Sequence, residues 1–310
     1  MGIGAKINTA KEETIKKVEN NNIIFNSRQP LYYLDDLILP RKIKNKILDI
    51  ASYAENSNLV FKTWGLESTH KFSRKIGINL WGPPGTGKTM AAHAIANYLN
   101  RKILIVNYAD IESKYVGETP KNICKAFEKA KMDNSILFFD EADAILSRRV
   151  TNMSHSTDVS VNQTRSVMLM LLNDYQDIVI FATNFIENFD PAFMRRILMH
   201  IKFELPDEEC RHLLWQKYIP RLMPNDFDIS YISKKYDDLS GSDISNAVLS
   251  AAFTAARNKQ EIVKQENLEE AIKNILDSKK ANEKEKVSVT TRKVSEDYVK
   301  SQIKISNGDE

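Results

Sequence analysis

The sequence predicts an α/β fold, in which a parallel β-sheet is covered by helices, followed by a small all-α domain. Two observations predict it. Short apolar runs alternate with longer amphipathic stretches, which is the pattern of a parallel sheet with crossover helices. After Pro206-Asp207 the strand-like runs stop, and apolar residues follow at helical spacing. The expected strands are Ile76–Trp81, Ile103–Val106, Ile136–Phe139, Ile178–Ala182 and His200–Leu205.

The expected helices lie between and after these strands. Met90–Leu99 and Thr119–Lys131 are expected to cover the sheet. In the all-α part, Ser242 or Asp243 can cap the second helix, and Asn267 can cap the third. The helices of this part are Glu208–Tyr218, Asp243–Arg257 and Asn267–Leu276.

Changes in composition divide the chain into four parts. Residues 1–33 are expected to form a short N-terminal arm, 34–206 the α/β domain, 207–278 the helical domain and 279–310 a charged C-terminal tail. Within the tail, Lys279–Lys286 is predicted to be a solvated linker because almost every residue in it is polar.

Composition excludes several classes of protein. The 310 residues are 42% hydrophobic, which is enough for a core and argues against wholesale disorder. Lys and Arg (44) nearly balance Asp and Glu (41), which disfavours a nucleic-acid coat protein. Cys124 and Cys210 have no partners at metal-ligand spacing and are expected to be buried thiols of a reducing compartment. No signal peptide and no apolar run of about 20 residues is visible, so we expect a cytoplasmic protein without a membrane span.

The strongest motif is a glycine-rich loop between the first strand and a helix. Its sequence, Gly82-Pro83-Pro84-Gly85-Thr86-Gly87-Lys88-Thr89, matches G-x-x-x-x-G-K-[ST]. Such a loop turns backbone N–H groups toward phosphate oxygens at a helix N-terminus. Lys88 can then reach the β- and γ-phosphates, and the Thr89 hydroxyl can bind Mg²⁺. The residues expected to bind ATP here are Pro83, Pro84, Gly85, Thr86, Gly87, Lys88, Thr89 and Met90.

A second motif follows the third strand. The apolar run Ile136–Phe139 is typical of a central parallel strand and ends in Asp140-Glu141. Acidic residues at the carboxyl end of such a strand lie where open α/β sheets bind ligands. We expect Asp140 to hold the Mg²⁺ shell together with Thr89, and Glu141 to polarise the attacking water as general base. A solvated acidic turn is the alternative for this pair taken alone.

With these two motifs in this order, the chain resembles the AAA (AAA+) ATPases from about Leu34 to Leu276. The resemblance implies the P-loop NTPase fold with a small all-α lid domain, Walker A and Walker B motifs, and ATP hydrolysis. Asn184, after the fourth strand, matches the sensor-1 position, where it would orient the lytic water. Without the resemblance, an Asn at this place is usually a turn former.

The segment Asp190–Arg196 resembles the second region of homology of the family. Its two arginines are adjacent, as in the severing, meiotic and membrane-extracting clade. The resemblance implies that Arg195 and Arg196 are arginine fingers for the nucleotide of the adjacent subunit; alone, they would be a surface pair ending a helix. Arginine suits this role because it stays charged and its planar fork matches phosphate oxygens.

Two further segments resemble parts of the family that contact adenosine. Gly241-Ser242-Asp243 is similar to the Gly-[Ala/Ser]-Asp element that closes over it, and the same residues can serve as a loop and N-cap. Asp35-Asp36-Leu37-Ile38 resembles the adenine-contacting segment, although Ile38-Leu39 stand where glycines are usual. The resemblance therefore adds Asp36, Leu37, Ile38, Gly241 and Ser242 to the expected nucleotide contacts.

The segment Lys114-Tyr115-Val116-Gly117 resembles the pore loop of AAA unfoldases. Tyr115 and Val116 would grip an extended polypeptide by apolar contact, and Gly117 would let the loop bend. Lys114 would lie on the pore rim or be ordinary surface charge. Asn152–Thr157 is either a second pore loop or a solvated linker.

These features favour a protein-remodelling ATPase that threads a protein substrate through a ring, a homo-hexamer by the resemblance. The alternatives are a nucleic-acid loader or translocase on the same fold, disfavoured by the near-neutral charge, and a regulatory nucleotide switch, disfavoured by Glu141. About 30 residues precede the ATPase core, so we expect a separate effector or adaptor protein to provide specificity. The similarity to stand-alone bacterial AAA ATPases points to a protease as this partner, and to phage defence as the setting.

Overall fold

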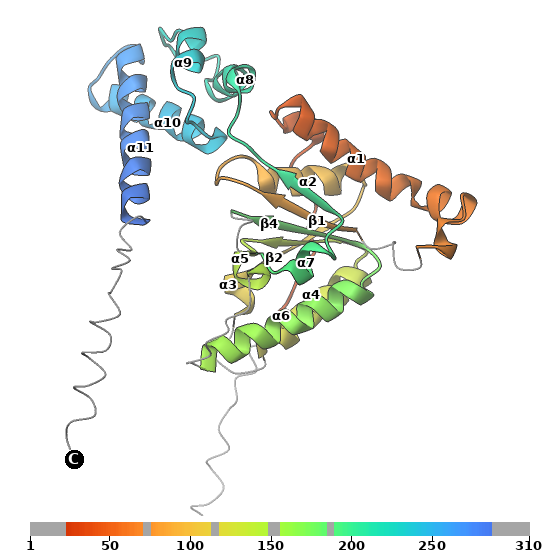
Figure 1. Cartoon of the computed structure of the whole chain (residues 1–310). Helices are drawn as coiled ribbons and strands as arrows, with labels where there is room; N and C mark the ends of the chain where they lie inside the picture. Colours follow the sequence, from red (N-terminus) through yellow and green to blue (C-terminus); the bar gives the residue numbers. More distant parts are fainter. Residues whose placement is uncertain (1–22, 71–75, 113–117, 148–155, 185–188, 287–310) are drawn as a thin grey trace, which may run out of the picture. The chain divides into compact units, whose positions relative to one another are not determined.

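The computed structural model describes residues 23–70, 76–112, 118–147, 156–184 and 189–286 (Figure 1). The chain forms two compact units, and each is described by itself. The first holds the described residues up to Leu37 together with Arg41–Gly82 and Gly87–Phe203. The second holds Ile38–Pro40, Pro83–Thr86 and the chain from Glu204 onward.

A five-stranded parallel sheet in the order β2-β3-β4-β1-β5 forms the centre of the first unit. β1 pairs with β4 along its whole length, from Ile76 opposite Ile178 to Trp81 opposite Thr183. The central strands are buried on both faces, which explains their continuous apolar runs. The strands are β1 Ile76–Trp81, β2 Ile103–Asn107, β3 Ile136–Asp140, β4 Ile178–Thr183 and β5 Met199–Lys202.

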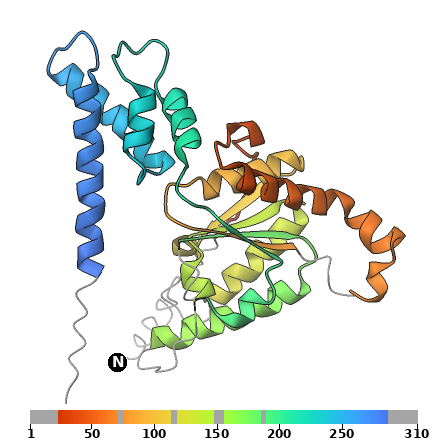
Figure 2. The same cartoon turned by 45° about the horizontal axis from the view of Figure 1, so that its top comes forward.

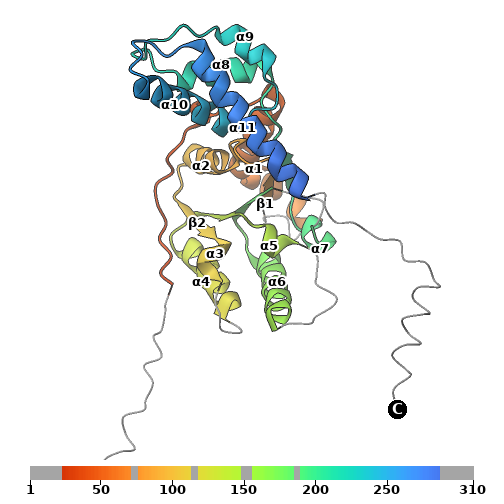
Figure 3. The same ribbon diagram turned by 90° about the vertical axis from the view of Figure 1, so that its left-hand side faces the viewer.

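Helices cover both faces of this sheet (Figure 3). Helices α1 and α2 lie on one face, and α3 to α6 lie on the other. On the second face Phe127 packs with Phe139, and Phe139 stacks on Phe181 with 5.4 Å between ring centroids. The helices of this unit are α1 Arg41–Asn58, α2 Lys88–Tyr98, α3 Tyr108–Ile111, α4 Glu118–Met132, α5 Asp143–Leu146, α6 Ser156–Asp174 and α7 Pro191–Met194.

Four helices and their connections make up most of the second unit (Figure 2). They surround a core in which Trp215, Ile232, Leu239, Leu268 and Ile272 are fully buried. Across the described part of the chain, no helix has both the length and the apolar character needed to cross a bilayer. The four helices are α8 Glu208–Tyr218, α9 Ile229–Lys235, α10 Gly241–Arg257 and α11 Gln265–Lys286.

The predicted fold class is confirmed, and the structure corrects several details. The last strand ends at Lys202 and not at Leu205, because the chain from Glu204 onward belongs to the second unit. α11 continues to Lys286, so the prediction of a solvated linker over Lys279–Lys286 was wrong. Lys, Glu and Ala dominate this stretch, and their high helix propensity favours the helix. Helices α1, α6 and α9 were not predicted.

The helix caps also differ from the prediction. Ser240, and not Ser242 or Asp243, is the N-cap of α10: its side chain accepts a hydrogen bond from Asp243 N. Asp243 lies at the third helical position, and its carboxylate returns a bond to Ser240 N, which completes a capping box. Asn267 lies inside the first turn of α11, where its Oδ1 accepts from Lys264 N at 3.1 Å.

The residues before η1 (Leu34–Asp36) lie along the sheet edge at β2. Arg28 pairs antiparallel with Ile103 through two backbone hydrogen bonds of 2.9 Å. The Ser27 hydroxyl donates to Asp133 Oδ2 at 2.6 Å, beyond the end of α4. Part of the segment predicted to be a separate arm is therefore integrated into the first unit.

Candidate active site

Lys88 begins α2, directly after the left-handed Gly87 (φ +95°). Its side chain points to the carboxyl edge of the sheet, where Nζ donates to Gly82 O at 2.7 Å and to Asn184 Oδ1 at 3.1 Å. The residue is 8% exposed. Burial lowers the pKa of the Lys88 ammonium, while the nearby charges of Asp140 and Asp143 oppose this shift. The buried ammonium of Lys88 is therefore held beside Gly82, the first residue of the glycine-rich loop, by its bonds to the oxygens of Gly82 and Asn184.

Thr89 and Asp140 meet although 51 residues separate them. Thr89 Oγ1 donates to Asp140 Oδ2 at 2.9 Å, and Asp140 Oδ1 accepts from the backbone N of Glu141 at 3.0 Å. Glu141 is exposed and has a left-handed backbone (φ +51°), which is unusual for a residue other than glycine. The turn after β3 therefore separates the directions of two successive carboxylates: Asp140 pairs with Thr89, and Glu141 is open to solvent.

Asn184 follows β4, which lies next to β3 in the sheet. Its backbone N donates to the carboxylate of Asp143, at 3.2 Å to Oδ1 and 3.3 Å to Oδ2. Asp143 was given no role in the sequence prediction, although it stands three residues after Asp140 in the same acidic segment. The structure thus brings together four predicted residues, Lys88, Thr89, Asp140 and Asn184, and adds Asp143 to them.

Gly82 ends β1 in a conformation that excludes a side chain. Its φ is +143°, and a Cβ atom would lie 2.0 Å from the backbone O of Phe203. Its backbone N also donates to Thr183 O at 3.2 Å, which ties the start of the loop to the end of β4. Glycine is required here because Phe203, the residue after β5, passes immediately beside it.

Comparison with known proteins identifies the family. The model of the AAA family, the ATPase family associated with various cellular activities, matches residues 78–205, and the AAA+ lid domain model matches residues 226–270. A 26S proteasome regulatory subunit homolog of Methanothermobacter thermautotrophicus is 31% identical over 274 residues, which cover 87% of this chain and 70% of the relative. The chain is an AAA ATPase.

Other relatives share the core of this AAA ATPase. The proteasome-activating nucleotidase of Methanopyrus kandleri is 32% identical over 66% of this chain and 48% of the relative. That of Saccharolobus solfataricus is 34% identical over 64% of this chain and 52% of the relative. The chain spans about half the length of these two relatives.

Within the second unit of the AAA ATPase, the glycine-rich loop packs on the start of α10. Ser242 N donates to Gly85 O at 3.3 Å, and Thr86 Oγ1 donates to Pro83 O at 2.8 Å. Gly85 has φ +75°, and a Cβ atom on it would lie 2.6 Å from Ser240 Oγ. The structure therefore brings Gly85 together with the predicted contacts Gly241 and Ser242. Pro83 and Pro84 are exposed on the loop, and Met90 is half-buried in the first turn of α2.

The two adjacent arginines have different surroundings. Both follow α7, whose N-cap Asp190 accepts from Arg165 at 3.0 Å. Arg196 donates from Nε to Asn173 Oδ1 at 2.9 Å and from Nη1 to Ala192 O at 2.8 Å. The Arg195 side chain is exposed and makes no hydrogen bond or ion pair with any residue that the structure describes. Its guanidinium is therefore available to an external group.

The predicted adenine segment is mostly engaged within the protein. Asp36 Oδ2 accepts from the backbone N of Tyr33 at 2.8 Å, across the 3₁₀ turn η1. Leu37 is buried, and Ile38 packs against the core of the second unit. Roles of Asp36, Leu37 and Ile38 in adenine binding stay predictions.

Lys114, Tyr115, Val116 and Gly117 fall outside the described residues, as does most of Asn152–Thr157.

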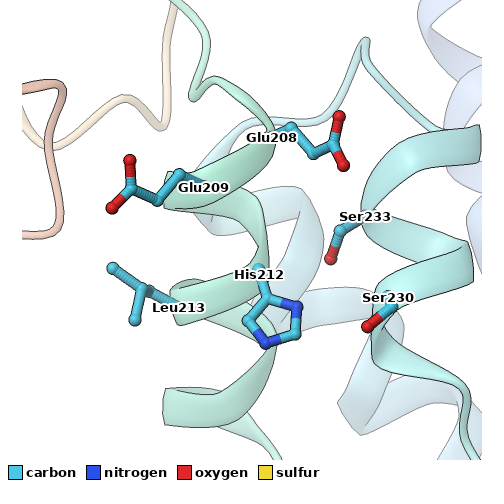
Figure 4. A pocket seen from close by; sticks show the side chains of 6 residues that line it. All are labelled: Glu208, Glu209, His212, Leu213, Ser230 and Ser233. Carbon is cyan, nitrogen blue, oxygen red and sulfur yellow. The ribbon is translucent and has the colours of Figure 1, made fainter.

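A surface pocket lies between α8 and α9, and none of the predicted site residues lines it (Figure 4). Its lining residues are Glu208, Glu209, His212, Leu213, Ser230 and Ser233.

Proposed function

We propose that this AAA ATPase couples ATP hydrolysis to the unfolding and threading of a protein substrate through the pore of a homo-hexameric ring. One observation carries the ATP-dependent part: Lys88, Thr89, Asp140 and Asn184 are joined at the carboxyl edge of the sheet by hydrogen bonds of 2.9 and 3.1 Å. The threading part is supported by relatives whose names describe proteasome-activating nucleotidases and proteasome regulatory subunits.

The residues at the edge of the sheet fit ATP and Mg²⁺. The ammonium of Lys88 is suited to the β- and γ-phosphates, and the backbone of Gly82–Thr89 to the remaining phosphate oxygens. Thr89 Oγ1 and Asp140 Oδ2, already 2.9 Å apart, offer the hard oxygen ligands that Mg²⁺ prefers. No group of three or more His, Cys, Asp and Glu side chains in the described ranges could hold a metal. The magnesium site is thus expected to need the phosphates of ATP.

Two residues are assigned to the attacking water. The exposed Glu141 takes its proton as general base, and Asn184 orients it through an amide that can donate and accept. The bound Mg²⁺ would neutralise charge on the phosphates, and an arginine from the neighbouring subunit would stabilise the transition state. Arg195 and Arg196 are proposed for that last role, which requires a ring.

The substrate is proposed to be a polypeptide gripped by Lys114–Gly117, with Tyr115 and Val116 as the apolar contacts. A separate partner, a protease by analogy with the names of the relatives, would receive the unfolded chain or select it. Phage defence stays a prediction of the sequence. No observation favours a nucleic-acid translocase, which is instead an outcome of the experiment below.

The experiment measures ATP turnover and the unfolding of a fluorescent protein that carries an unstructured tail. Glu141→Gln should bind ATP but lower turnover by about 100-fold or more. Tyr115→Ala should keep ATP turnover and abolish unfolding, whereas Tyr98→Ala, which changes a partly exposed tyrosine at the end of α2, should affect neither. Unfolding that persists in Tyr115→Ala would contradict threading. ATP turnover stimulated by DNA in a salt-dependent way would support the translocase instead.

A further inference from the structure

Lys279, in the second half of α11, contacts the turn that leads into α10. Its Nζ lies 2.7 Å from Asp243 Oδ2 and donates to the backbone O of Asp238 at 2.8 Å. The side chains of Lys279 and Asp243 are 31% and 16% exposed, so the ion pair is partly shielded from water. Lys279, the first residue of the segment that the sequence predicts to be a linker, is therefore attached to the start of α10.

Asp243, the partner of Lys279, also forms hydrogen bonds with Ser240. Its Oδ2 accepts from Ser240 N at 2.7 Å and from Ser240 Oγ at 2.6 Å, and Ser240 Oγ accepts from Asp243 N at 3.3 Å. Burial opposes a charge on Asp243, but the hydrogen bonds from Lys279 and Ser240 outweigh it and hold the pKa of the carboxyl below its ordinary value. The charged carboxylate thus fixes both the backbone and the hydroxyl of Ser240.

Ser240 in turn lies against the glycine-rich loop. A Cβ atom on Gly85 would be 2.6 Å from Ser240 Oγ, and Ser242 N donates to Gly85 O at 3.3 Å. Lys279, Asp243, Ser240 and Gly85 therefore form an uninterrupted series of contacts, all within the second unit.

We infer that Lys279 is a positioning residue for ATP. By holding Asp243, and through it Ser240, it fixes the turn on which Gly85 rests, and α11 thereby sets the affinity for nucleotide. The inference rests on the nucleotide-binding part of the proposed function and is independent of threading. Because Lys279 acts on the loop and not on the reacting atoms, its loss should raise KM for ATP and leave kcat nearly unchanged.

The test compares the dissociation constant for ATP in chains that also carry Glu141→Gln, so that ATP is not consumed. Lys279→Met should weaken binding by about three- to tenfold, the range for a partly exposed ion pair with further hydrogen bonds. Lys279→Arg should restore it to within about twofold, because the guanidinium can reach the same carboxylate. Lys280→Met is the matched control: Lys280 is exposed and has no ion pair within the described ranges.

A double substitution tests whether Lys279 acts through Asp243. Asp243→Asn should weaken ATP binding as Lys279→Met does, and the two together should be no worse than the worse single variant. If Lys279→Met lowers the melting temperature of the nucleotide-free chain but leaves ATP affinity unchanged, its role is structural and the inference is wrong. In chains that keep Glu141, a fall in kcat at constant KM on Lys279→Met would also overturn the inference. Unchanged ATP affinity in Lys88→Ala would instead contradict the proposed nucleotide site itself.

Discussion

Lys88 Nζ donates a 3.1 Å hydrogen bond to Asn184 Oδ1, across a sequence separation of 96 residues. The bond joins the first turn of α2 to the end of β4. On the other side of Asn184, the carboxylate of Asp143 accepts from its backbone N. The lysine proposed to bind phosphate and the residue proposed to orient the water are therefore positioned by one network, and Asp143 anchors it.

The first prediction concerns Asp143. Asp143→Ala should lower kcat by about 10- to 100-fold with little change in KM for ATP, because a small displacement of Asn184 misaligns the attacking water. Asp174→Ala removes an exposed carboxylate from the end of α6 and should leave turnover unchanged. Steady-state kinetics of the two variants check this. A rise in KM without a loss of kcat would show that Asp143 serves ATP binding instead.

The second prediction separates the two arginines. The guanidinium of Arg195 has no partner among the described residues, whereas that of Arg196 is held by Asn173 and Ala192. Arg195→Ala should therefore lower kcat by about a thousandfold while ATP affinity is retained, and Arg196→Ala should cost about tenfold. Arg221→Ala, which removes an exposed arginine of the second unit, is the control and should be neutral.

Mixing experiments test whether Arg195 acts between subunits. Chains with Lys88→Ala keep Arg195, and chains with Arg195→Ala keep Lys88. Each should be nearly inactive alone, and a mixture should regain ATP turnover because some neighbours combine an intact pocket with an intact arginine. A mixture as inactive as its components would rule out action in trans.

The third prediction uses two glycines with the same backbone angle. Gly85 and Gly65 both have φ +75°, but a Cβ atom meets Ser240 Oγ at 2.6 Å on Gly85 and nothing within 4 Å on Gly65. Gly65→Ala should lower the free energy of unfolding by about 1–2 kcal/mol and leave ATP binding unchanged. Gly85→Ala should in addition weaken ATP binding at least tenfold, because the loop must move away from α10. Equal ATP affinities in the two variants would contradict the packing of the loop on Ser240.

The fourth prediction concerns the cysteines, which are free thiols. Burial, with help from Asp207, raises the pKa of the Cys210 thiol to about 12, and burial also raises the pKa of the half-buried Cys124. Both should react slowly with iodoacetamide at pH 8 in the folded chain and rapidly in urea. Because the folded pKa lies above the unfolded one, Cys210 keeps its proton longer in the folded state. Its contribution to stability should therefore fall as the pH rises from about 9 toward 12. Alkylation of folded Cys210 at the rate of a free thiol would contradict its burial.

The elements of the candidate active site were predictable because each is continuous in sequence. The Gly82–Thr89 loop and the Asp140-Glu141 pair each follow an apolar strand, so the strand periodicity fixes where their side chains emerge. Asn184, the proposed sensor residue, was placed by the same reasoning together with the family resemblance. These positions depend on local sequence and on the parallel order of the strands.

The contacts that the sequence did not predict are tertiary. Neither the bond from Asn184 N to the Asp143 carboxylate nor the one from Arg196 to Asn173 leaves a pattern in the chain, because each joins residues on different elements. The C-terminal half of α11 was missed for another reason: its charged residues suit a linker as well as an exposed helix, and the pairing of Lys279 with Asp243, which adds to their helix propensity, is a tertiary contact.

The pairing of Arg28 with Ile103 covers part of an outer strand of the sheet and so opposes self-association. β2 is an outer strand of the sheet, and outer strands with open backbone groups can add strands from other molecules. Arg28 satisfies both the N–H and the C=O of Ile103, and the cation of Arg28 discourages a further strand. A chain shortened to the predicted start of the α/β domain at Leu34 would lose this cover and become prone to aggregation. Arg28 and its neighbours thus protect one position of the outer strand of the ATPase domain from pairing with another molecule.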